Sequence, residues 1–595
     1  MYGWIQYCYG GVQSKLFVEH NIIHASAGVQ QGDPLGPLLF ALVLHPLLTR
    51  LRQDFAVTVG AYLDDLTIAG SADQVSQAIQ YLRREGPSHG LSMSMSKSIV
   101  WSPSGRDLSN SDLFAGMTCS RDNGVELLGG AISTSQDFYK SVIDKRVDKC
   151  VDTMNKMMQL RDPQLCLMLL RACEGMPKLV YSWRTTPPEF LEDAAIRFDH
   201  VILLALRWII VGDGPSFGSF HQRLATLPVS MGGLGVLLPT DIRRFAFCAS
   251  ALSSLNIQQA ILGAPAISSA QDIPQSVQDC LLSAGHHIAG PNAIAFNQEV
   301  IQKSFDPHAA APPFNTQLFM ARAYFESKKS NLLNDPYITS KSLAVRRKFK
   351  GIIDSNSVEG TSAWLFALPN GGLKQEMSTL EFQAAVSLRL LIPQFSPGSK
   401  CCQRTCTAYM DIYGYHALNC RGHFLTRHNT VRDALFDLMI YGRFNPVKDA
   451  DVMCLGHRSD RPTALRPADL LIAGDGYFDR NCVDVTIVSP IVTNNQPNIK
   501  VGDAAQRAEQ AKYDKHAQAC DTAGYGFNAF AMDVFGVRGK QSNILLERVI
   551  EKMSRETCCP KYKSQAICHR RISMALQLGV SRQLLASRRV VDAPD

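Results

Sequence analysis

Two adjacent aspartates, Asp64 and Asp65, lie between short apolar runs in the segment AYLDDLTIA, residues 61–69. This pattern predicts a β-hairpin with the two acids at its turn. Carboxylates gathered at a strand tip are the oxygen ligands that Mg²⁺ prefers, and two such ions stabilise the attacking and leaving oxygens in nucleotidyl transfer. Taken alone, such a pair is usually only a turn.

A second pair of acids stands on two predicted strands, where Asp469 opens the run 469–473 and Asp484 lies within 482–489. A predicted helix over 503–521 follows, and its Lys512 and Lys515 share one face because they are three residues apart. Paired carboxylates can bind a divalent metal that activates a water, and a lysine can orient that water or stabilise charge on phosphorus. The pattern predicts phosphodiester hydrolysis; the alternative is that these acids only border strands.

Cysteines and histidines gather at residues 401–428. Four of them supply N and S ligands within nineteen residues, a donor set that zinc binds as a tetrahedron: Cys402, Cys406, His416 and Cys420. Cys401 could replace Cys402, and His423 or His428 could replace His416. Three arginines around this cluster are expected to contact nucleic acid: Arg404, Arg421 and Arg427. The alternative is a patch of buried thiols with a surface histidine.

Length and composition limit the rest of the chain. At 595 residues, 46% hydrophobic and 19% charged, it has room for three to five domains. No stretch reaches the roughly 18 uninterrupted apolar residues of a membrane helix, so we expect no membrane partner. Seventeen cysteines, an odd number, favour reduced thiols with one metal site over a disulfide framework. The net charge of +7 is modest, but basic residues gather at 341–350 and after Val537, as phosphate-binding surfaces or as solvated helix faces.

A glycine-rich segment, SAGVQQGDPLGPLLF at residues 26–40, precedes the acidic turn. It predicts a turn leading into a helix that Asp33 caps and Pro34 begins. Followed by YLDD at 62–65, it closely resembles the palm of reverse transcriptases, particularly those of non-LTR retrotransposons. Three later segments are similar to further motifs of the same palm and thumb: GLSMSMSKS at 90–98, LLGG at 127–130, and residues 227–235.

This resemblance assigns roles to single residues. Asp64 and Asp65 would be the metal-binding pair, with Asp64 the more critical, and Lys97 would assist the leaving pyrophosphate. Gln30, Gly32 and Tyr62 would lie near the incoming nucleotide and the template. The family's palm also has a third carboxylate upstream of the glycine-rich turn, whereas here no Asp or Glu occurs between Met1 and Val18. We therefore expect the chain as given to be deficient in polymerisation.

The C-terminal motifs resemble other parts of the same elements. The spacing D-x-x-G-x-H-A-x-x-C, residues 411–420, is similar to their CCHC zinc knuckle, and Asp469, Asp484 and a displaced lysine are similar to their restriction-like endonuclease. Thr486 occupies the position where an ordinary restriction fold has lysine, which makes Lys512 the better candidate and Lys515 the second. His516 stands where the family often has tyrosine.

The elements that must position these residues make a multidomain α+β chain of five parts. We expect a partial reverse transcriptase palm over 1–135, a helical thumb over 136–255, a helical connector over 256–395, a zinc knuckle over 396–430, and an α/β restriction-like (PD-D/ExK) nuclease with a basic tail over 431–595.

The resemblance implies reverse transcription primed at a nicked target, with Mg²⁺ or Mn²⁺ and Zn²⁺ as cofactors. It also implies element RNA, target DNA and dNTPs as partners, and a nuclear location. The alternatives are an endonuclease alone and a non-catalytic nucleic-acid-binding remnant. The sequence leaves the oligomeric state open.

Overall fold

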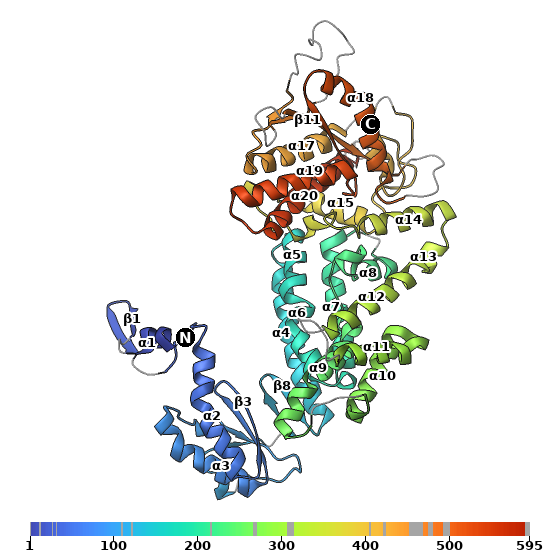
Figure 1. Cartoon of the computed structure of the whole chain (residues 1–595). Helices are drawn as coiled ribbons and strands as arrows, with labels where there is room; N and C mark the ends of the chain where they lie inside the picture. Colours follow the sequence, from blue (N-terminus) through green and yellow to red (C-terminus); the bar gives the residue numbers. More distant parts are fainter. Residues whose placement is uncertain are drawn as a thin grey trace.

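The structure is a computed structural model that describes residues 2–10, 14–25, 28–30, 32–108, 111–120, 123–214, 217–265, 270–305, 315–403, 406–420, 424–450, 468–473, 480–491 and 500–588. Figure 1 shows the N-terminal part, in blue, and the C-terminal part, in orange and red, at opposite ends of the molecule. A column of helices runs between them.

The N-terminal part is built around one hairpin and two helices. Strand β3 (Val57–Tyr62) pairs antiparallel with β4 (Asp65–Gly70), and α2 (Gly36–Asp54) and α3 (Ala72–Glu85) pack against this pair. Six residues form its own small core: Leu44, Leu47, Leu51, Val59, Ala78 and Tyr81. Apolar residues of α2 recur at helical spacing and those of β3 alternate, as a helix on a two-stranded sheet requires.

Smaller elements flank this hairpin along the chain. They are α1 (Tyr2–Tyr9), the antiparallel pair β1 (Ser14–Val18) and β2 (Asn21–Ala25), the parallel pair β5 (Ile99–Val100) and β6 (Thr118–Cys119), and the antiparallel pair β7 (Gly124–Leu127) and β8 (Gly130–Ser133). None of the residues of α1 is buried.

The middle of the described chain is helical. Its first group is α4 (Gln136–Met158), α5 (Pro163–Leu169), α6 (Met176–Thr185), α7 (Glu192–Val211), α8 (Ser219–Ala225) and α9 (Pro239–Leu262). The second is α10 (Gln275–Ala289), α11 (Ala293–Ser304), α12 (Thr316–Leu333), α13 (Pro336–Thr339), α14 (Leu343–Ser355) and α15 (Thr379–Arg389). The helical character expected for residues 136–395 is therefore present.

One large core joins these helices to the C-terminal part, because a single cluster of buried apolar residues extends from Ile143 to Leu584. Arg389 illustrates the joining: it is buried and donates hydrogen bonds to the carbonyl of Gly233, 2.9 Å away, and to the hydroxyl of Ser362, 2.8 Å away. The domain boundaries at 255, 395 and 430 do not coincide with a break in this core, and they stay predictions.

Helix α9 bears on the expected lack of a membrane partner. Among the described helices it alone is long and apolar enough to span a membrane by length and composition, a weak criterion that buried core helices also meet. It contacts α6, α7, α10 and α12 and buries Asp241 and Arg243 as well as apolar residues. Of its most apolar 18-residue window, 33% is buried in the structure.

The C-terminal part is a four-stranded mixed sheet covered by helices. The strand order is β12 (Gly526–Asp533), β11 (Arg480–Val488), β10 (Leu470–Ala473), β9 (Val447–Lys448), with β11 and β12 parallel and the other pairs antiparallel. Helix α18 (Asp503–Thr522) connects the parallel pair, since parallel neighbours need a crossover. Its companions are α16 (Tyr415–Asn419), α17 (Phe424–Tyr441), α19 (Lys540–Glu556) and α20 (Lys561–Arg588). The predicted strands and helix are confirmed to within two residues at each end.

Candidate functional site

The first acidic pair lies on the tip of the β3–β4 hairpin, as predicted. Tyr62 pairs with Asp65, so Leu63 and Asp64 are the two turn residues, and the side chains of Tyr62, Asp64 and Asp65 are exposed. Leu63 has a φ of 54°, a left-handed conformation that costs a bulky residue about 1–2 kcal/mol. Among the described residues, Asp64 and Asp65 belong to no group of three ligand atoms within 4.8 Å of one another. Their metal-binding role stays a prediction.

The glycine-rich turn before this hairpin has an open backbone. Gly32 has a φ of 90°, and a Cβ built there meets no atom within 4 Å. The carboxylate of Asp33 accepts hydrogen bonds from the Tyr9 hydroxyl and from the Leu35 N–H, and these two donors lower the pKa of Asp33. Helix α2 begins at Gly36, two residues later than the Pro34 start predicted, and its N-cap is Leu35 and not the predicted Asp33. Gln30 is exposed beside this turn.

Two further motifs of the N-terminal part form turns. Lys97 is exposed on a single 3₁₀ turn, Met95–Lys97. The LLGG segment is a two-residue hairpin between β7 and β8, in which Leu128 and Gly129 have φ of 48° and 75°. Its Leu128 carbonyl accepts a hydrogen bond from the Tyr181 hydroxyl, 2.8 Å away on α6, which fixes the turn to the helical middle of the chain.

A cluster of three cysteines and one histidine lies at the start of the C-terminal part. The ligand atoms of Cys401, Cys406, His416 and Cys420 all lie within 4.8 Å of one another. The Sγ atoms of Cys401 and Cys420 are 3.7 Å apart, and Cys406 Sγ is 3.4 Å from His416 Nε2. Zinc bonds of about 2.3 Å to sulfur and about 2.0 Å to nitrogen set tetrahedral ligands about 3.5–3.8 Å apart. These four residues fit a zinc ion.

The local chain explains the spacing of this motif. Asp411 accepts hydrogen bonds from the N–H groups of Tyr413 and Tyr415, at 3.0 and 3.1 Å, and from that of His416. Gly414 has a φ of 81°, and a Cβ there would lie 2.5 Å from the Phe395 ring and 2.8 Å from Leu584. Asp411 and Gly414 therefore shape the turn that presents His416.

The ligand set requires one correction, because Cys401 takes the place predicted for Cys402. Lys400 and Tyr409 form an antiparallel bridge, and the Cys401 N–H donates to the Ala408 carbonyl at 3.0 Å. Neighbouring side chains in extended chain point to opposite sides, so only one of the two adjacent thiols faces the cluster. Burial raises the pKa of the Cys401 thiol to about 12, whereas the Ala408 N–H lowers that of Cys406.

Arg427 is a second correction, since it is buried and does not face solvent. Its guanidinium donates to the carbonyls of Leu418 and Ile487, at 2.6 and 3.2 Å, and to the Gln583 side chain at 3.1 Å. It therefore joins α17 to three other elements and is not available to nucleic acid. Arg404, Arg421 and His423 lie outside the described residues.

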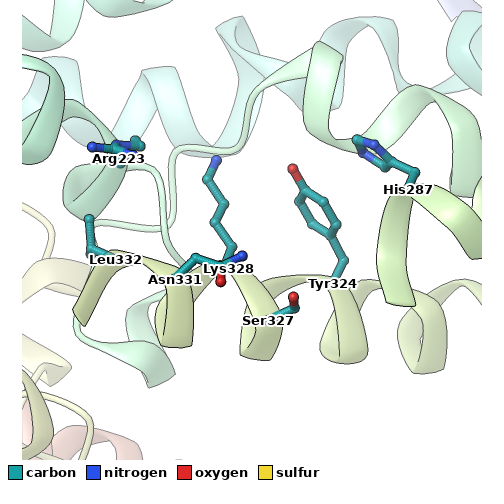
Figure 2. A pocket seen from close by; sticks show the side chains of 7 residues that line it. All are labelled: Arg223, His287, Tyr324, Ser327, Lys328, Asn331 and Leu332. Atoms are coloured by element: carbon teal, nitrogen blue, oxygen red, sulfur yellow. The ribbon is translucent and has the colours of Figure 1, made fainter. Parts of the chain in front are cut away.

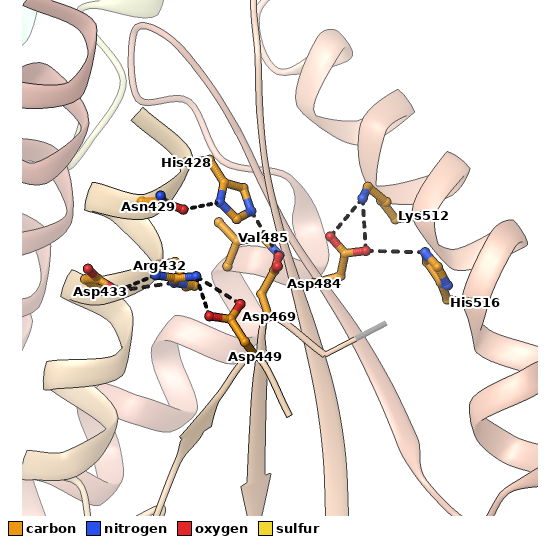
Figure 3. Close-up of polar contacts among 10 residues, drawn as sticks. All are labelled: His428, Asn429, Arg432, Asp433, Asp449, Asp469, Asp484, Val485, Lys512 and His516. Carbon is orange, nitrogen blue, oxygen red and sulfur yellow. Dashed lines mark hydrogen bonds and ion pairs between the residues drawn. The ribbon is translucent and has the colours of Figure 1, made fainter. Parts of the chain in front are cut away.

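The second acidic pair is brought together by the β10–β11 pairing (Figure 3). Leu470 pairs with Val483, so Asp469 lies opposite Asp484 one step further along the same register. Directly opposed side chains in an antiparallel pair lie on the same face of the sheet. The Oδ2 atom of Asp469 also accepts a hydrogen bond from the Val485 N–H, 2.7 Å away. Residues that are fifteen apart in the chain are thus side by side at one end of the strand pair. Like Asp64 and Asp65, they belong to no group of three ligand atoms within 4.8 Å of one another among the described residues.

Helix α18 supplies the predicted lysine to this point. Lys512 Nζ lies 2.9 Å from both carboxylate oxygens of Asp484, which is 3% exposed. His516, one turn further along α18, places Nε2 3.4 Å from Asp484 Oδ2. Burial raises the pKa of Asp484 despite the opposing charge of Lys512. The pKa of His516 is lowered to about 4, mainly by burial and further by the positive charges of Lys515 and Lys512.

Helix α17 contributes a histidine from the other side, as Figure 3 shows. His428 Nε2 lies 3.0 Å from Asp469 Oδ2. Burial raises the pKa of Asp469, but the hydrogen bonds and charge of His428 and the Val485 N–H outweigh burial and bring it below its ordinary value. Burial lowers the pKa of His428, but the hydrogen bond to Asp469 outweighs burial, so the pKa of His428 is raised above its ordinary value. Lys515 is exposed on α18.

The roles of His428 and His516 at this site were not predicted from the sequence. His516 could have been found, because it is four residues after Lys512 and so lies on the same helix face. His428 was considered only as a zinc ligand, and its contact with Asp469 joins residues 41 positions apart, for which the sequence carries no signal.

A pocket of about 310 Å³ lies elsewhere, between α8, α10 and α12 (Figure 2). Its lining includes Arg223 and Lys328, but these cations form ion pairs with Asp335 and Asp241. None of the residues predicted to be functional lines it.

Comparison with known proteins assigns the N-terminal part. The family of reverse transcriptases (RNA-dependent DNA polymerases) matches residues 1–132. The chain is also 22% identical over 235 residues to the retrotransposable element SLACS 132 kDa protein of Trypanosoma brucei gambiense. That match covers 37% of this chain and 18% of the length of the SLACS protein. Residues 1–132 are therefore a reverse transcriptase domain, and the chain is distantly similar to a retrotransposon protein.

Proposed function

We propose that this chain combines its reverse transcriptase domain with a metal-dependent DNA endonuclease in the C-terminal part. The observation that carries the proposal is the meeting of Asp469, Asp484 and Lys512 across two paired strands and one helix. A carboxylate pair with a lysine beside it is an arrangement that can hydrolyse a phosphodiester. The restriction-like fold remains part of the proposal, supported by the mixed four-stranded sheet.

The donors at this point suit Mg²⁺ or Mn²⁺, because both acids offer oxygen and the small cation keeps several waters and substrate phosphates in its remaining positions. A bound ion would lower the pKa of a water and neutralise charge on the phosphate. Asp469 and Asp484 would hold it from adjacent strands. Lys512, released from Asp484 by that ion, would contact the phosphate whose charge grows during cleavage.

A second candidate activity is RNA-directed DNA synthesis from nucleotides on a nucleic-acid template, the activity of the family that residues 1–132 match, in which the chain as given is expected to be deficient. Asp64 and Asp65 would bind its divalent metal, with Gln30, Gly32, Tyr62 and Lys97 around the nucleotide. In the combined scheme the nicked 3′ end of target DNA primes copying of the element's RNA, which implies a nuclear location. In this scheme, the cluster of Cys401, Cys406, His416 and Cys420 holds zinc.

Strand nicking tests the endonuclease directly. Purified 595-residue chain is incubated with a labelled DNA duplex and with supercoiled DNA, in Mg²⁺ and in Mn²⁺. Nicking that Asp469→Ala and Asp484→Ala each abolish supports the proposal. The matched control is Asp521→Ala, which removes an exposed acid from the end of α18 and should leave the rate unchanged. Binding without nicking would leave a nucleic-acid-binding protein instead, and nicking at the parent rate in both alanine variants would overturn the assignment of these two acids.

Polymerisation needs its own measurement, because two exposed acids must recruit further ligands before they can hold two metals. Primer extension on poly(rA)/oligo(dT) with Mg²⁺ separates the two outcomes. Synthesis that Asp64→Ala abolishes establishes a polymerase in this chain, whereas nicking without synthesis restricts its activity to the endonuclease.

A further inference from the structure

We propose that His428 is a positioning residue of the C-terminal site, which turns one oxygen of Asp469 toward a divalent metal. The inference rests on the proposed endonuclease and goes beyond it, because it assigns a task to a residue outside the Asp469, Asp484 and Lys512 set. The two carboxylate oxygens of Asp469 differ in their hydrogen bonding.

Both hydrogen bonds that the described residues make to the side chain of Asp469 end on the same atom. Oδ2 accepts from His428 Nε2, 3.0 Å away, and from the Val485 N–H, 2.7 Å away. Oδ1 receives no donor from any residue in the described ranges. Two donors on one oxygen fix the rotation of the carboxylate and leave the other oxygen to a cation. Partners of this kind tune metal-binding carboxylates in proteins, and their loss typically costs 10–100-fold in metal affinity or activity.

Asp484 is held in a different way. Lys512 contacts both of its oxygens, and His516 lies near one of them. A metal that approaches Asp484 competes with the Lys512 ammonium at both carboxylate oxygens, whereas Oδ1 of Asp469 carries no competing donor among the described residues. The first contact of an arriving cation is therefore with Asp469, in the orientation that His428 sets.

The position of His428 is determined by tight helix packing. A Cβ at Gly579 of α20 would lie 2.4 Å from the Cα of Arg427, so α17 crosses α20 at the closest distance that glycine allows. Arg427 fastens the same turn to β11 through the Ile487 carbonyl. One turn later, Arg432 binds Asp449, whose N–H donates to the Asp469 carbonyl at 2.9 Å. Helix α17 thus holds both the main chain and the side chain of Asp469.

Three variants test the proposal: His428→Ala, His428→Gln and, as a matched control, His286→Ala, which removes an exposed histidine of α10. Glutamine retains a neutral donor at the position of Nε2. We measure Mn²⁺ binding by electron paramagnetic resonance and the Mg²⁺ concentration that gives half-maximal nicking. Alanine should weaken both about 10–100-fold at unchanged DNA affinity. Glutamine should restore most of the loss, and His286→Ala should match the parent chain.

The outcomes separate this proposal from the endonuclease itself. If the parent chain nicks DNA and Asp484→Ala does not, the endonuclease stands, and unchanged metal dependence in His428→Ala then overturns the role of His428. If no chain nicks, the Mn²⁺ measurement still decides, since equal affinity in the alanine variant and the parent refutes positioning. Equal loss in alanine and glutamine variants at an unchanged circular dichroism spectrum also contradicts it.

Discussion

Asp64 and Asp65 stand in solvent on a hairpin with a six-residue core of its own, whereas Asp469 and Asp484 are partly or fully buried against a core that reaches through most of the molecule. Both pairs offer the same ligand atoms. The C-terminal acids contact two histidines, a lysine and a backbone N–H, while the exposed acids are held by their turn alone. A buried carboxylate with hydrogen-bond partners is oriented before any metal binds. An exposed carboxylate must be oriented by the substrate or by further ligands.

The largest loss of stability is expected from a substitution in the zinc cluster, which lies in the C-terminal part. Cys401→Ser should lose zinc and destabilise the C-terminal part of the chain, because zinc binding contributes on the order of 10 kcal/mol in isolated zinc modules. The N-terminal hairpin should be unaffected. Metal content by mass spectrometry, together with limited proteolysis of each part, measures both results.

Cys402→Ser is the matched control, since this neighbouring thiol lies outside the ligand group. It should bind zinc as the parent chain does. Zinc lost from Cys402→Ser and kept by Cys401→Ser would reverse the ligand assignment.

A smaller effect is expected when the lysine of the C-terminal site is removed. Lys512→Met leaves the carboxylate of Asp484 buried without its cation, and because Lys512 itself is 32% exposed we expect a loss of about 1–3 kcal/mol. Lys515→Met on the same helix is exposed and should change stability by less than about 0.5 kcal/mol. Asp64→Ala in the hairpin should change stability by an equally small amount. Urea unfolding of the three variants tests this order, and equal losses would contradict the contrast between the two sites.

The smallest effect concerns the strained turn of the N-terminal hairpin. Leu63→Gly relieves a left-handed leucine, and after the entropy cost of glycine we expect a gain of about 0.5–1 kcal/mol. Proteolytic cleavage within residues 57–70 should become slower. Faster cleavage would show that contacts of the leucine side chain, and not its backbone strain, dominate this turn.

The local sequence pattern was sufficient to predict those elements whose structure depends on residues adjacent in the chain. The apolar runs around Asp64 and Asp65 predicted the hairpin because turn residues and flanking strands are adjacent in sequence. The runs that carry Asp469 and Asp484, and the helix that carries Lys512, were found for the same reason. The residue types of the cysteine and histidine cluster also indicated zinc, since the donor chemistry does not depend on where the chain goes next.

Only the tertiary structure decided which of these residues meet. Cys401 replaces Cys402 because a bridge sets which of two adjacent thiols faces inward, and spacing does not record that direction. Arg427 is buried because three distant carbonyl or amide oxygens converge on it. His428 reaches Asp469 because α17 packs against α20 at Gly579. The sequence by itself determined the chemistry that is present; long-range packing determined which groups hold one another, because those contacts join residues that lie far apart along the chain.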